Sequence, residues 1–286
     1  MILEIIQTRQ AKIGENNFVK RVLPFRSRRS LGPFCFLDHM GPMTIPEDQS
    51  GDVLSHPHIG LETVTYLFSG QLHHRDSLGH RQIIKPGDVN WMTAGHGIAH
   101  SERNIFESAN IQLHGLQAWV ALPKQHEDCD PAFTHYPNSI LPKFSIDQTE
   151  IHLITGEFLN YMSPVKTYFQ TLYVHLNMSP NSQFIFLNKY EELGFYLVDG
   201  SVEIDNELFD KPTLIVFKPN QEIKIKSIRK VMGVLIGGEK LPEPRFMFWN
   251  FVSTDKDKIE QAKIDWKSGQ FPKVIDETDI IPLPEI

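Results

Sequence analysis

Two pairs of polar residues in the first half of the chain have the types and spacing of metal ligands. His56 and His58 form the first pair, and His100 and Glu102 form the second. Residues two apart on a β-strand point to the same face, about 6–7 Å apart along the backbone. Two such pairs on neighbouring strands would direct three imidazoles and one carboxylate at a single point. That donor set suits a divalent metal of borderline softness.

The distribution of histidine also favours a site. The chain has 13 histidines, of which nine lie between His39 and His114 and none follows His175. A single histidine is more often a solvated or hydrogen-bonded side chain than a metal ligand. Because chance would not readily gather so many in one segment, we predict a metal site within residues 56–102.

The composition limits the class of protein. The 286 residues are 41% hydrophobic and 22% charged, which is typical of a globular chain with one large core or two domains. The formal net charge is −7, and the densest basic patch is only Arg26-Ser-Arg28-Arg29, so direct nucleic-acid binding is not expected. We expect neither a secretory signal nor a membrane span. Two cysteines are too few for a disulfide framework, so a reducing, cytoplasmic setting with a buried Cys35 is predicted.

Short segments rich in β-branched and aromatic residues recur along the chain, separated by glycine, proline, asparagine and aspartate. Strands at this spacing, without helical periods between them, predict antiparallel sandwiches or barrels. Clear examples are residues 62–68, 112–122, 167–177 and 213–218.

One helix is predicted near the end of the chain. Ser253 or Thr254 would cap its start, and Gly269 would end it. Its apolar side chains recur at helical spacing, which predicts a helix packed on the outside of a barrel. These side chains are Ile259, Ala262 and Trp266. The proline-rich tail 272–286 is expected to be extended.

A short internal repeat indicates that the two halves are copies of one barrel. Residues 66–70, Tyr-Leu-Phe-Ser-Gly, recur as Tyr-Leu-Val-Asp-Gly at 196–200. The same offset places Phe186 where the first copy has His56, and Asn188 where it has His58. The second barrel is therefore predicted to lack the metal ligands, with a boundary between residues 145 and 165.

Several segments of the N-terminal half, in fixed order, resemble the pirin family of the cupin superfamily. The C-terminal half follows the family pattern more loosely, through the degenerate second barrel and the final helix. The motifs are specific for the family and its fold and do not identify a substrate. They are Gly32-Pro-Phe-Cys-Phe-Leu-Asp38, His56-Pro-His-Ile-Gly-Leu-Glu-Thr-Val-Thr-Tyr-Leu67, His74-Arg-Asp-Ser-Leu-Gly79, Pro86-Gly-Asp-Val-Asn-Trp-Met-Thr-Ala-Gly95 and Gly97-Ile-Ala-His-Ser-Glu102.

The resemblance implies an all-β fold of two antiparallel cupin jelly-roll barrels in tandem with a few short helices. Residues 1–150 would form the metal-binding barrel, and residues 151–286 the degenerate barrel with the helix and tail. One divalent transition metal per chain is implied, with Fe(II) the expected ion. Position by position, the four ligands of the family match His56, His58, His100 and Glu102.

The resemblance also bears on residues around the centre. Cupins often use a further glutamate, here Glu62, as a ligand, but in pirin-like proteins that residue is expected off the metal. His96 stands where the family often has arginine or a small residue, and we expect it at the mouth of the pocket. Phe36, Trp91 and Met92 are expected in the core, and Phe34 nearer the pocket.

Two functions follow from such a centre. The first is a quercetin 2,3-dioxygenase-type oxidoreductase that opens a flavonol or related phenolic with O2, an activity known among pirin-like proteins. Glu62 is its candidate general base, because it lies four residues after His58 and on the same strand face if no bulge intervenes. The simpler alternative is that Glu62 only hydrogen-bonds a ligand imidazole or a neighbouring turn.

The second function is a non-enzymatic iron-binding module whose redox state changes its affinity for a protein partner, as proposed for pirin in transcription. An enzyme needs an open apolar pocket at the metal, whereas a sensor needs only a redox-dependent surface. In either case we expect a monomer or weak dimer that binds neither nucleic acid directly nor a membrane.

Overall fold

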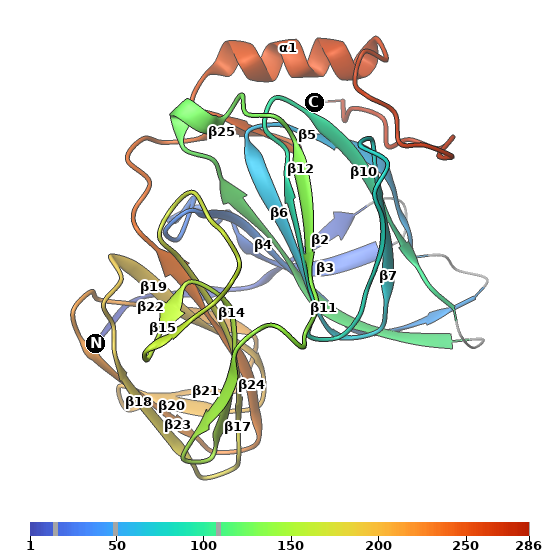
Figure 1. Ribbon diagram of the computed structural model, residues 1–286. Helices are drawn as coiled ribbons and strands as arrows, with labels where there is room; N and C mark the ends of the chain where they lie inside the picture. The colour runs from blue at the N-terminus through green and yellow to red at the C-terminus, as the bar shows by residue number, and fades with distance from the viewer. Residues whose placement is uncertain (14–16, 48–50, 107–109, 286) are drawn as a thin grey trace. The chain divides into compact units, whose positions relative to one another are not determined.

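Antiparallel β-strands form most of the chain in the computed structural model, which describes residues 1–13, 17–47, 51–106 and 110–285. They build two cupin barrels, and the chain ends in one α-helix and an extended tail (Figure 1). The prediction of an all-β protein with two tandem cupin barrels and a helix near the C-terminus is confirmed.

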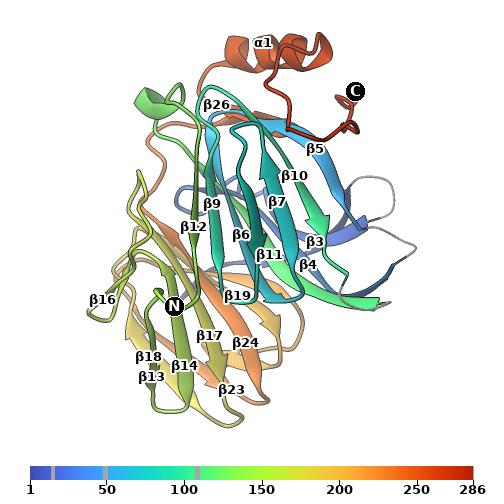
Figure 2. The same ribbon diagram turned by 45° about the vertical axis from the view of Figure 1, so that its right-hand side comes forward.

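The first barrel consists of a seven-stranded and a four-stranded sheet, and Figure 2 shows the smaller sheet with β7 and β10 side by side. The larger sheet has the order β12 (Ala132–Tyr136), β9 (Val89–Thr93), β6 (Leu61–Ser69), β11 (Asn110–Ala121), β4 (Phe34–Pro46), β3 (Asn17–Leu23) and β2 (Arg9–Ile13). The smaller sheet has the order β5 (Val53–His58), β10 (Ile98–Asn104), β7 (Leu72–Asp76) and β8 (Arg81–Ile84).

The second barrel has the same combination of seven and four strands, as the internal repeat predicts. Its larger sheet has the order β1 (Ile2–Gln7), β22 (Thr213–Phe217), β19 (Glu192–Asp199), β24 (Val231–Gly238), β17 (Thr171–Met178), β14 (Thr149–Thr155) and β13 (Lys143–Ile146). Its smaller sheet has the order β18 (Gln183–Leu187), β23 (Glu222–Ser227), β20 (Val202–Ile204) and β21 (Glu207–Phe209). The two repeated motifs lie on β6 and β19, each the third strand of its larger sheet.

Four very short strands and one 3-10 turn complete the described structure. They are β15 (Glu157–Phe158), β16 (Tyr161–Met162), β25 (Phe246–Phe248), β26 (Phe251–Ser253) and the turn Lys124–His126.

The predicted strands coincide with β6, β11 and β22 to within two residues, but β17 begins four residues later than predicted. The hydroxyl of Thr167 donates a 2.7 Å hydrogen bond to the carbonyl of Phe169. Such local side-chain bonds offer the backbone an alternative to a sheet ladder. The β-branched and aromatic residues of the segment 167–169, Thr-Tyr-Phe, therefore did not produce a strand.

Each barrel unit is built from segments that are distant in sequence. One compact unit comprises residues 1–9, 21–37 and 139–241, and the other comprises 10–20, 38–138 and 242–286. The predicted linear division into 1–150 and 151–286 differs from this pattern at both ends of the chain. The first strand pairs with β22 in the second barrel, and the C-terminal helix packs on the first.

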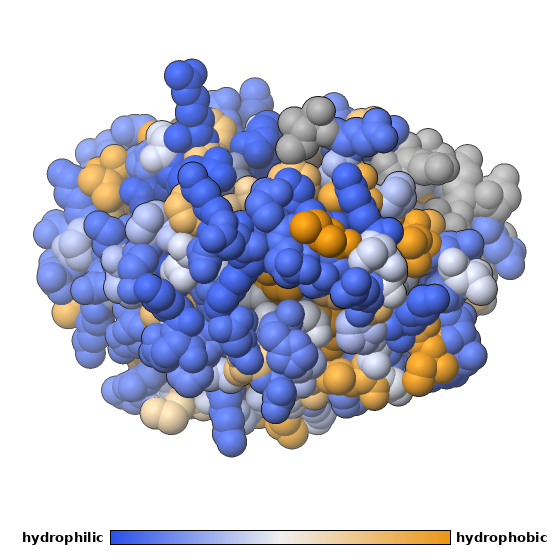
Figure 3. Space-filling view, turned by 90° about the horizontal axis from the view of Figure 1, so that it is seen from above, coloured by the Kyte–Doolittle hydropathy of each residue, from blue (hydrophilic) through white to orange (hydrophobic). Residues whose placement is uncertain are grey.

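The C-terminal helix, α1 (Lys256–Lys267), begins after Asp255, whose side chain accepts a hydrogen bond from the Asp257 amide. The predicted caps Ser253 and Thr254 are therefore wrong as N-caps, because Glu127 already accepts hydrogen bonds from both hydroxyls. Ile259, Ala262 and Trp266 are buried as predicted, in a cluster that includes Ile59 and Ala99 of the barrel. Viewed from above, the surface is largely hydrophilic (Figure 3), as expected for the exposed side of such a helix.

The C-terminal tail braces the two strands that carry the histidine pairs. The Ile281 amide donates to the Ser55 carbonyl on β5 at 2.8 Å. The Glu277 carboxylate accepts from Ser101 Oγ at 3.0 Å and from Arg103 Nε at 2.8 Å, both on β10. Since Ser101 and Arg103 alternate with His100 and Glu102, the tail holds the face of β10 opposite the predicted ligands.

We expect Glu277→Gln to lower the free energy of unfolding by about 1.5–3 kcal/mol, the usual range for a hydrogen bond to a charged group. The hydrogen bond from Arg103 lowers the pKa of Glu277, against the opposing effect of burial. A carboxylate with a depressed folded pKa stabilises the protein above its unfolded pKa of about 4.3, and that contribution is lost as the pH falls further. Urea unfolding at pH 7 and pH 3.5 measures both effects. Equal stability of the variant and the wild type at pH 7 would refute the role of the tail, and Ser101→Ala is the milder control.

Candidate metal centre

The structure brings three of the four predicted ligands together. His56, His58 and His100 are all buried, and their donor nitrogens lie within 4.8 Å of one another. His100 on β10 stands directly opposite His56 on β5, and the Nε2 atoms of His58 and His100 are 3.1 Å apart. Two nitrogens at about 2.1 Å from one ion and at right angles would be about 3 Å apart. The cluster therefore has the spacing of a metal site.

Burial keeps the imidazoles of this cluster neutral, which is the form that binds a metal. Burial lowers the pKa of His56 to about 4, although a hydrogen bond to the Leu54 backbone opposes the shift. Burial and the neighbouring His56 hold the pKa values of His58 and His100 well below the ordinary range. Three uncharged donors around one point, buried in a barrel, are a costly arrangement unless something binds them.

The partner of His56 indicates which of its nitrogens faces the cluster. His56 Nδ1 lies 2.8 Å from the Leu54 carbonyl, which can only accept, so Nδ1 carries the proton. Nε2 then keeps its lone pair. A backbone acceptor on the far nitrogen is one of the common ways in which a protein orients a metal-binding histidine. The residues present thus fit a borderline divalent metal.

The fourth predicted ligand, Glu102, lies outside this histidine cluster. Its Oε1 accepts a 2.8 Å hydrogen bond from Thr65, and its Oε2 accepts one of 2.8 Å from Gln117. The β5–β10 ladder shifts register between His100 and Glu102. Burial raises the pKa of Glu102, and the Thr65 hydrogen bond opposes that shift. Its assignment as a ligand stays a prediction.

Glu62 is buried on β6, where Thr93 donates a 2.8 Å hydrogen bond to its Oε1. Burial raises its pKa to about 7. The strand argument that linked Glu62 to His58 does not hold, because β5 ends at His58 and Gly60 turns the chain at a φ of +68°. A side chain at Gly60 would meet the Val252 carbonyl at 1.9 Å, so glycine is required there. The role of Glu62 as a base stays a prediction.

Other predicted residues take varied positions. Ser101 points away from the cluster to Glu277, as a regular strand requires, and Cys35 is buried. Phe36, Trp91 and Met92 are in the core as predicted. Phe34 is fully buried, and its ring meets Tyr173 edge-on at 6.0 Å within the unit of the second barrel, so its expected place near the pocket stays a prediction.

His96 is more than half exposed and lines a cavity of about 300 Å³ beside α1. Ile59, Ala262 and Phe271 are among the other residues around this cavity, and the three clustered histidines are not among its described lining residues. His96 therefore lines a cavity, but the described residues around that cavity do not include the histidine cluster, so its place at the mouth of the metal pocket stays a prediction.

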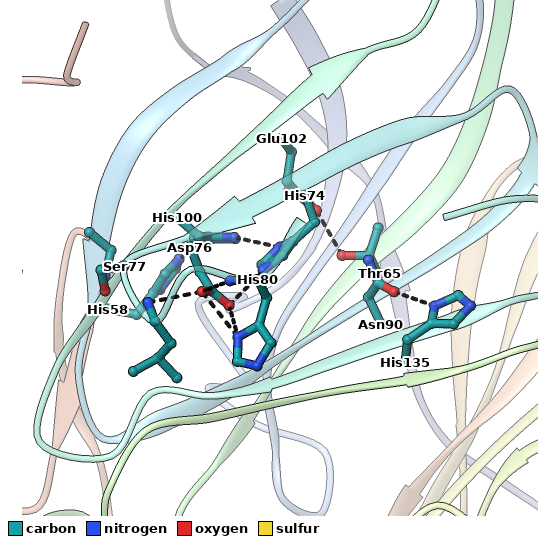
Figure 4. A network of polar contacts seen from close by, with 12 residues as sticks. His58, Thr65, His74, Asp76, Ser77, His80, Asn90, His100, Glu102 and His135 are labelled. Carbon is teal, nitrogen blue, oxygen red and sulfur yellow. Dashed lines mark hydrogen bonds and ion pairs between the residues drawn. The ribbon is translucent and has the colours of Figure 1, made fainter. Parts of the chain in front are cut away.

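Sequence reasoning missed a group of polar residues beside the cluster (Figure 4). His74 and Asp76 on β7 are buried, and His74 Nε2 lies 3.1 Å from Asp76 Oδ2. His74 Nδ1 lies 3.4 Å from His100 Nδ1. The signal was present in the sequence, because His74 and Asp76 form a third pair with one residue between its members.

In the second barrel, the positions equivalent to His56 and His58 are occupied by Phe186 and Asn188, whose side chains make structural contacts. Phe186 packs against Phe184 and Phe158, and all three belong to the main hydrophobic cluster of that barrel. The side chain of Asn188 donates to the Lys218 carbonyl and accepts from the Tyr190 amide. Both side chains are thus engaged in structural contacts.

The buried neutral histidines predict acid sensitivity of the metal-free protein. Burial lowers the pKa of His56 to about 4, of His152 to about 4 and of His39 to about 3. An unfolded chain protonates histidine below about pH 6.5. The unfolded state therefore binds more protons between about pH 6.5 and pH 4, and stability must fall as the pH drops through this window.

Each such histidine is expected to cost the fold up to about 2 kcal/mol between pH 7 and pH 5. Urea unfolding of the metal-free protein across this range measures the loss. His152→Asn removes one of the three groups and should flatten the pH dependence without touching the cluster. A free energy of unfolding that is constant from pH 7 to pH 5 would contradict the prediction.

The fold and the site together define a bicupin with a three-histidine cluster in its first barrel. The family model described as Pirin matches residues 16–120, and the one described as Pirin C-terminal cupin domain matches residues 173–272. The chain belongs to the pirin family.

Relatives agree with this assignment over the whole chain. A pirin-like protein of Caulobacter vibrioides is 44% identical, with all of both chains covered. A crystal structure described as quercetin 2,3-dioxygenase from Acinetobacter baumannii is 35% identical, with a TM-score of 0.93, and the match covers 100% of this chain and 96% of that one. Human pirin is 29% identical, over 93% of this chain and 91% of its own. Among the described residues, no helix has both the length and the apolar character to cross a membrane.

Proposed function

We propose that this protein is a metal-dependent dioxygenase of the quercetin 2,3-dioxygenase type, which opens a flavonol or related phenolic ring with O2. The observation that carries the proposal is the buried cluster of three neutral imidazoles, with ring nitrogens of His58 and His100 3.1 Å apart. The likeness to a structure described as quercetin 2,3-dioxygenase, at 35% identity and a TM-score of 0.93, supports the reaction class.

His56, His58 and His100 would hold the metal, with Glu102 as the proposed fourth ligand and Fe(II) as the proposed ion. When bound, the metal would supply a Lewis acid and an electron relay for the phenolic substrate and O2. Thr65 and Gln117 fix the Glu102 carboxylate through both of its oxygens. A carboxylate held in this way would face the site in one orientation and add negative charge to it.

Glu62 is the proposed general base. Its pKa of about 7 is close to the value at which a base is most effective at neutral pH. The Thr93 hydrogen bond occupies Oε1, so Oε2 is the atom proposed to take a proton from a substrate hydroxyl. The chemistry of such a site selects a substrate with an acidic phenolic hydroxyl and a planar apolar body.

The test is anaerobic reconstitution with Fe(II), followed by measurement of O2 uptake over a panel of flavonols and catechols. Uptake with at least one flavonol, with ring-opened product identified by mass spectrometry, is the expected result. Complete Fe(II) loading without uptake on any member of the panel would refute the enzyme proposal. That outcome would favour a module that signals its iron redox state to a protein partner.

A further inference from the structure

A chain of polar contacts leads away from the histidine cluster through β7 to the partly exposed His80 (Figure 4). It starts at His100, whose Nδ1 lies 3.4 Å from His74 Nδ1. His74 Nε2 lies 3.1 Å from Asp76 Oδ2, and His80 Nδ1 lies 3.0 Å from the same oxygen. His80 is the outer end, because its side chain is 44% exposed while that of Asp76 is fully buried.

The turn after β7 fixes Asp76. Its Oδ1 accepts the backbone amides of Leu78 at 2.9 Å and of His80 at 3.0 Å. An ionised carboxylate can only accept hydrogen bonds, so each of these groups donates to Asp76. The ring of His74 is held as well, because it stacks on Phe133 with centroids 4.2 Å apart and planes at 12°.

When His74 is neutral, these contacts determine the proton positions from the outside inward. Because the Asp76 carboxylate can only accept, His74 Nε2 carries the single proton of that ring, and His74 Nδ1 is an acceptor. In that state His100 Nδ1 donates to it. His100 Nε2 keeps its lone pair on the side where it lies 3.1 Å from His58 Nε2.

We propose that His74 and Asp76 are positioning residues that fix the tautomer and ring orientation of His100 as a metal ligand. Metal-binding histidines commonly donate their second N–H to a carboxylate, and loss of such a partner typically costs about 10–100-fold in metal affinity. Here the imidazole of His74 lies between the ligand His100 and the carboxylate of Asp76. These two residues of β7 would therefore influence the metal through His100 on β10. The inference rests on the metal centre proposed above and not on the choice of substrate.

The test compares Co(II) affinity, by competition with a chromophoric chelator, among three variants and the wild type. His74→Leu removes the acceptor and should weaken binding by about 10–100-fold. His74→Asn keeps an acceptor near the position of Nδ1 and should recover part of that loss. Asp76→Asn keeps the volume but places an NH2 group against donors, so it too should weaken binding. His73→Leu, one residue away on the other strand face, is the matched control and should bind as the wild type does.

A second readout separates positioning from general stability. Long-range 1H–15N correlation spectra of the metal-free protein report the tautomer of His100, which should be the Nδ1–H form in the wild type. Asp76→Asn should give a mixture of tautomers, and it keeps the test decisive if His74→Leu does not fold. Wild-type Co(II) affinity and an unchanged His100 tautomer in Asp76→Asn would overturn the inference. If His100→Ala also kept its metal, the metal centre itself would be refuted instead.

Discussion

Replacing His100 with alanine is expected to weaken Fe(II) binding by at least about 100-fold. Loss of an outer hydrogen-bond partner of a metal ligand typically weakens binding by about 10–100-fold, and removal of the ligand itself should be no milder. The ring centroid of His100 lies 4.4 Å from that of His56 and 5.0 Å from that of His58. Its loss removes one of three nitrogen donors and leaves a space that water would fill. Anaerobic equilibrium dialysis with metal analysis measures the effect.

His56→Ala and His58→Ala should behave in the same way, because each contributes one nitrogen to the same point. His135→Ala is the matched control, since His135 lies in the same barrel but bonds to Asn90 at 2.8 Å. A full complement of metal in His100→Ala would exclude the centre proposed here.

Glu102→Gln separates a four-ligand centre from a three-histidine centre. The amide keeps an oxygen for the Thr65 hydrogen bond but loses the charge that a metal would favour. If Glu102 is a ligand, this variant should also lose metal affinity. Unchanged affinity would leave the three histidines as the whole protein contribution to the site.

Strands of the barrels could be predicted from the sequence where the residue types within one short segment were enough to identify a strand. Segments rich in β-branched and aromatic residues located β6 and β11, and the repeated motif at 66–70 and 196–200 indicated two equivalent barrels. The pairing of β1 with β22 joins residues about 200 positions apart, such as Ile6 and Leu214. Local composition has no information on such a pairing. The sequence therefore could not predict that residues 1–9 belong to the unit of the second barrel and residues 242–286 to the unit of the first.

The same limit applies to the candidate site. Spacing alone predicted that His56 and His58 share a strand face, but the register that places His100 opposite His56 depends on pairing between strands. The prediction that Glu62 shares a strand face with His58 failed at Gly60. This residue has a left-handed backbone conformation and separates β5 from β6, so the alternation of side chains does not continue from His58 to Glu62. His74 and Asp76 had the spacing of the other pairs, and only the pairing of β7 with β10 shows why that spacing matters.

Replacing Glu62 with glutamine is expected to reduce turnover by about 100-fold or more while metal binding is retained, the usual range for a lost general base. The substitution is nearly isosteric, and its amide oxygen can still accept the 2.8 Å hydrogen bond from Thr93. A purely structural Glu62 would therefore lose little. Burial raises the pKa of Glu62 to about 7, so the carboxylate form needed in a base is gained as the pH rises through neutrality.

The pH profile of the wild-type enzyme should show this group directly. Turnover with a reactive flavonol should rise with pH and level off above an apparent pKa near 7. In Glu62→Gln this rise of turnover with pH, the rising limb of the profile, should vanish together with most of the activity, while Fe(II) content stays at the wild-type level. Thr93→Val removes the hydrogen bond to Oε1, which raises the pKa of Glu62 further and should shift the limb to higher pH. Unchanged turnover and an unchanged pH profile in Glu62→Gln would mean that Glu62 only completes the hydrogen bonding of its neighbours in the barrel wall.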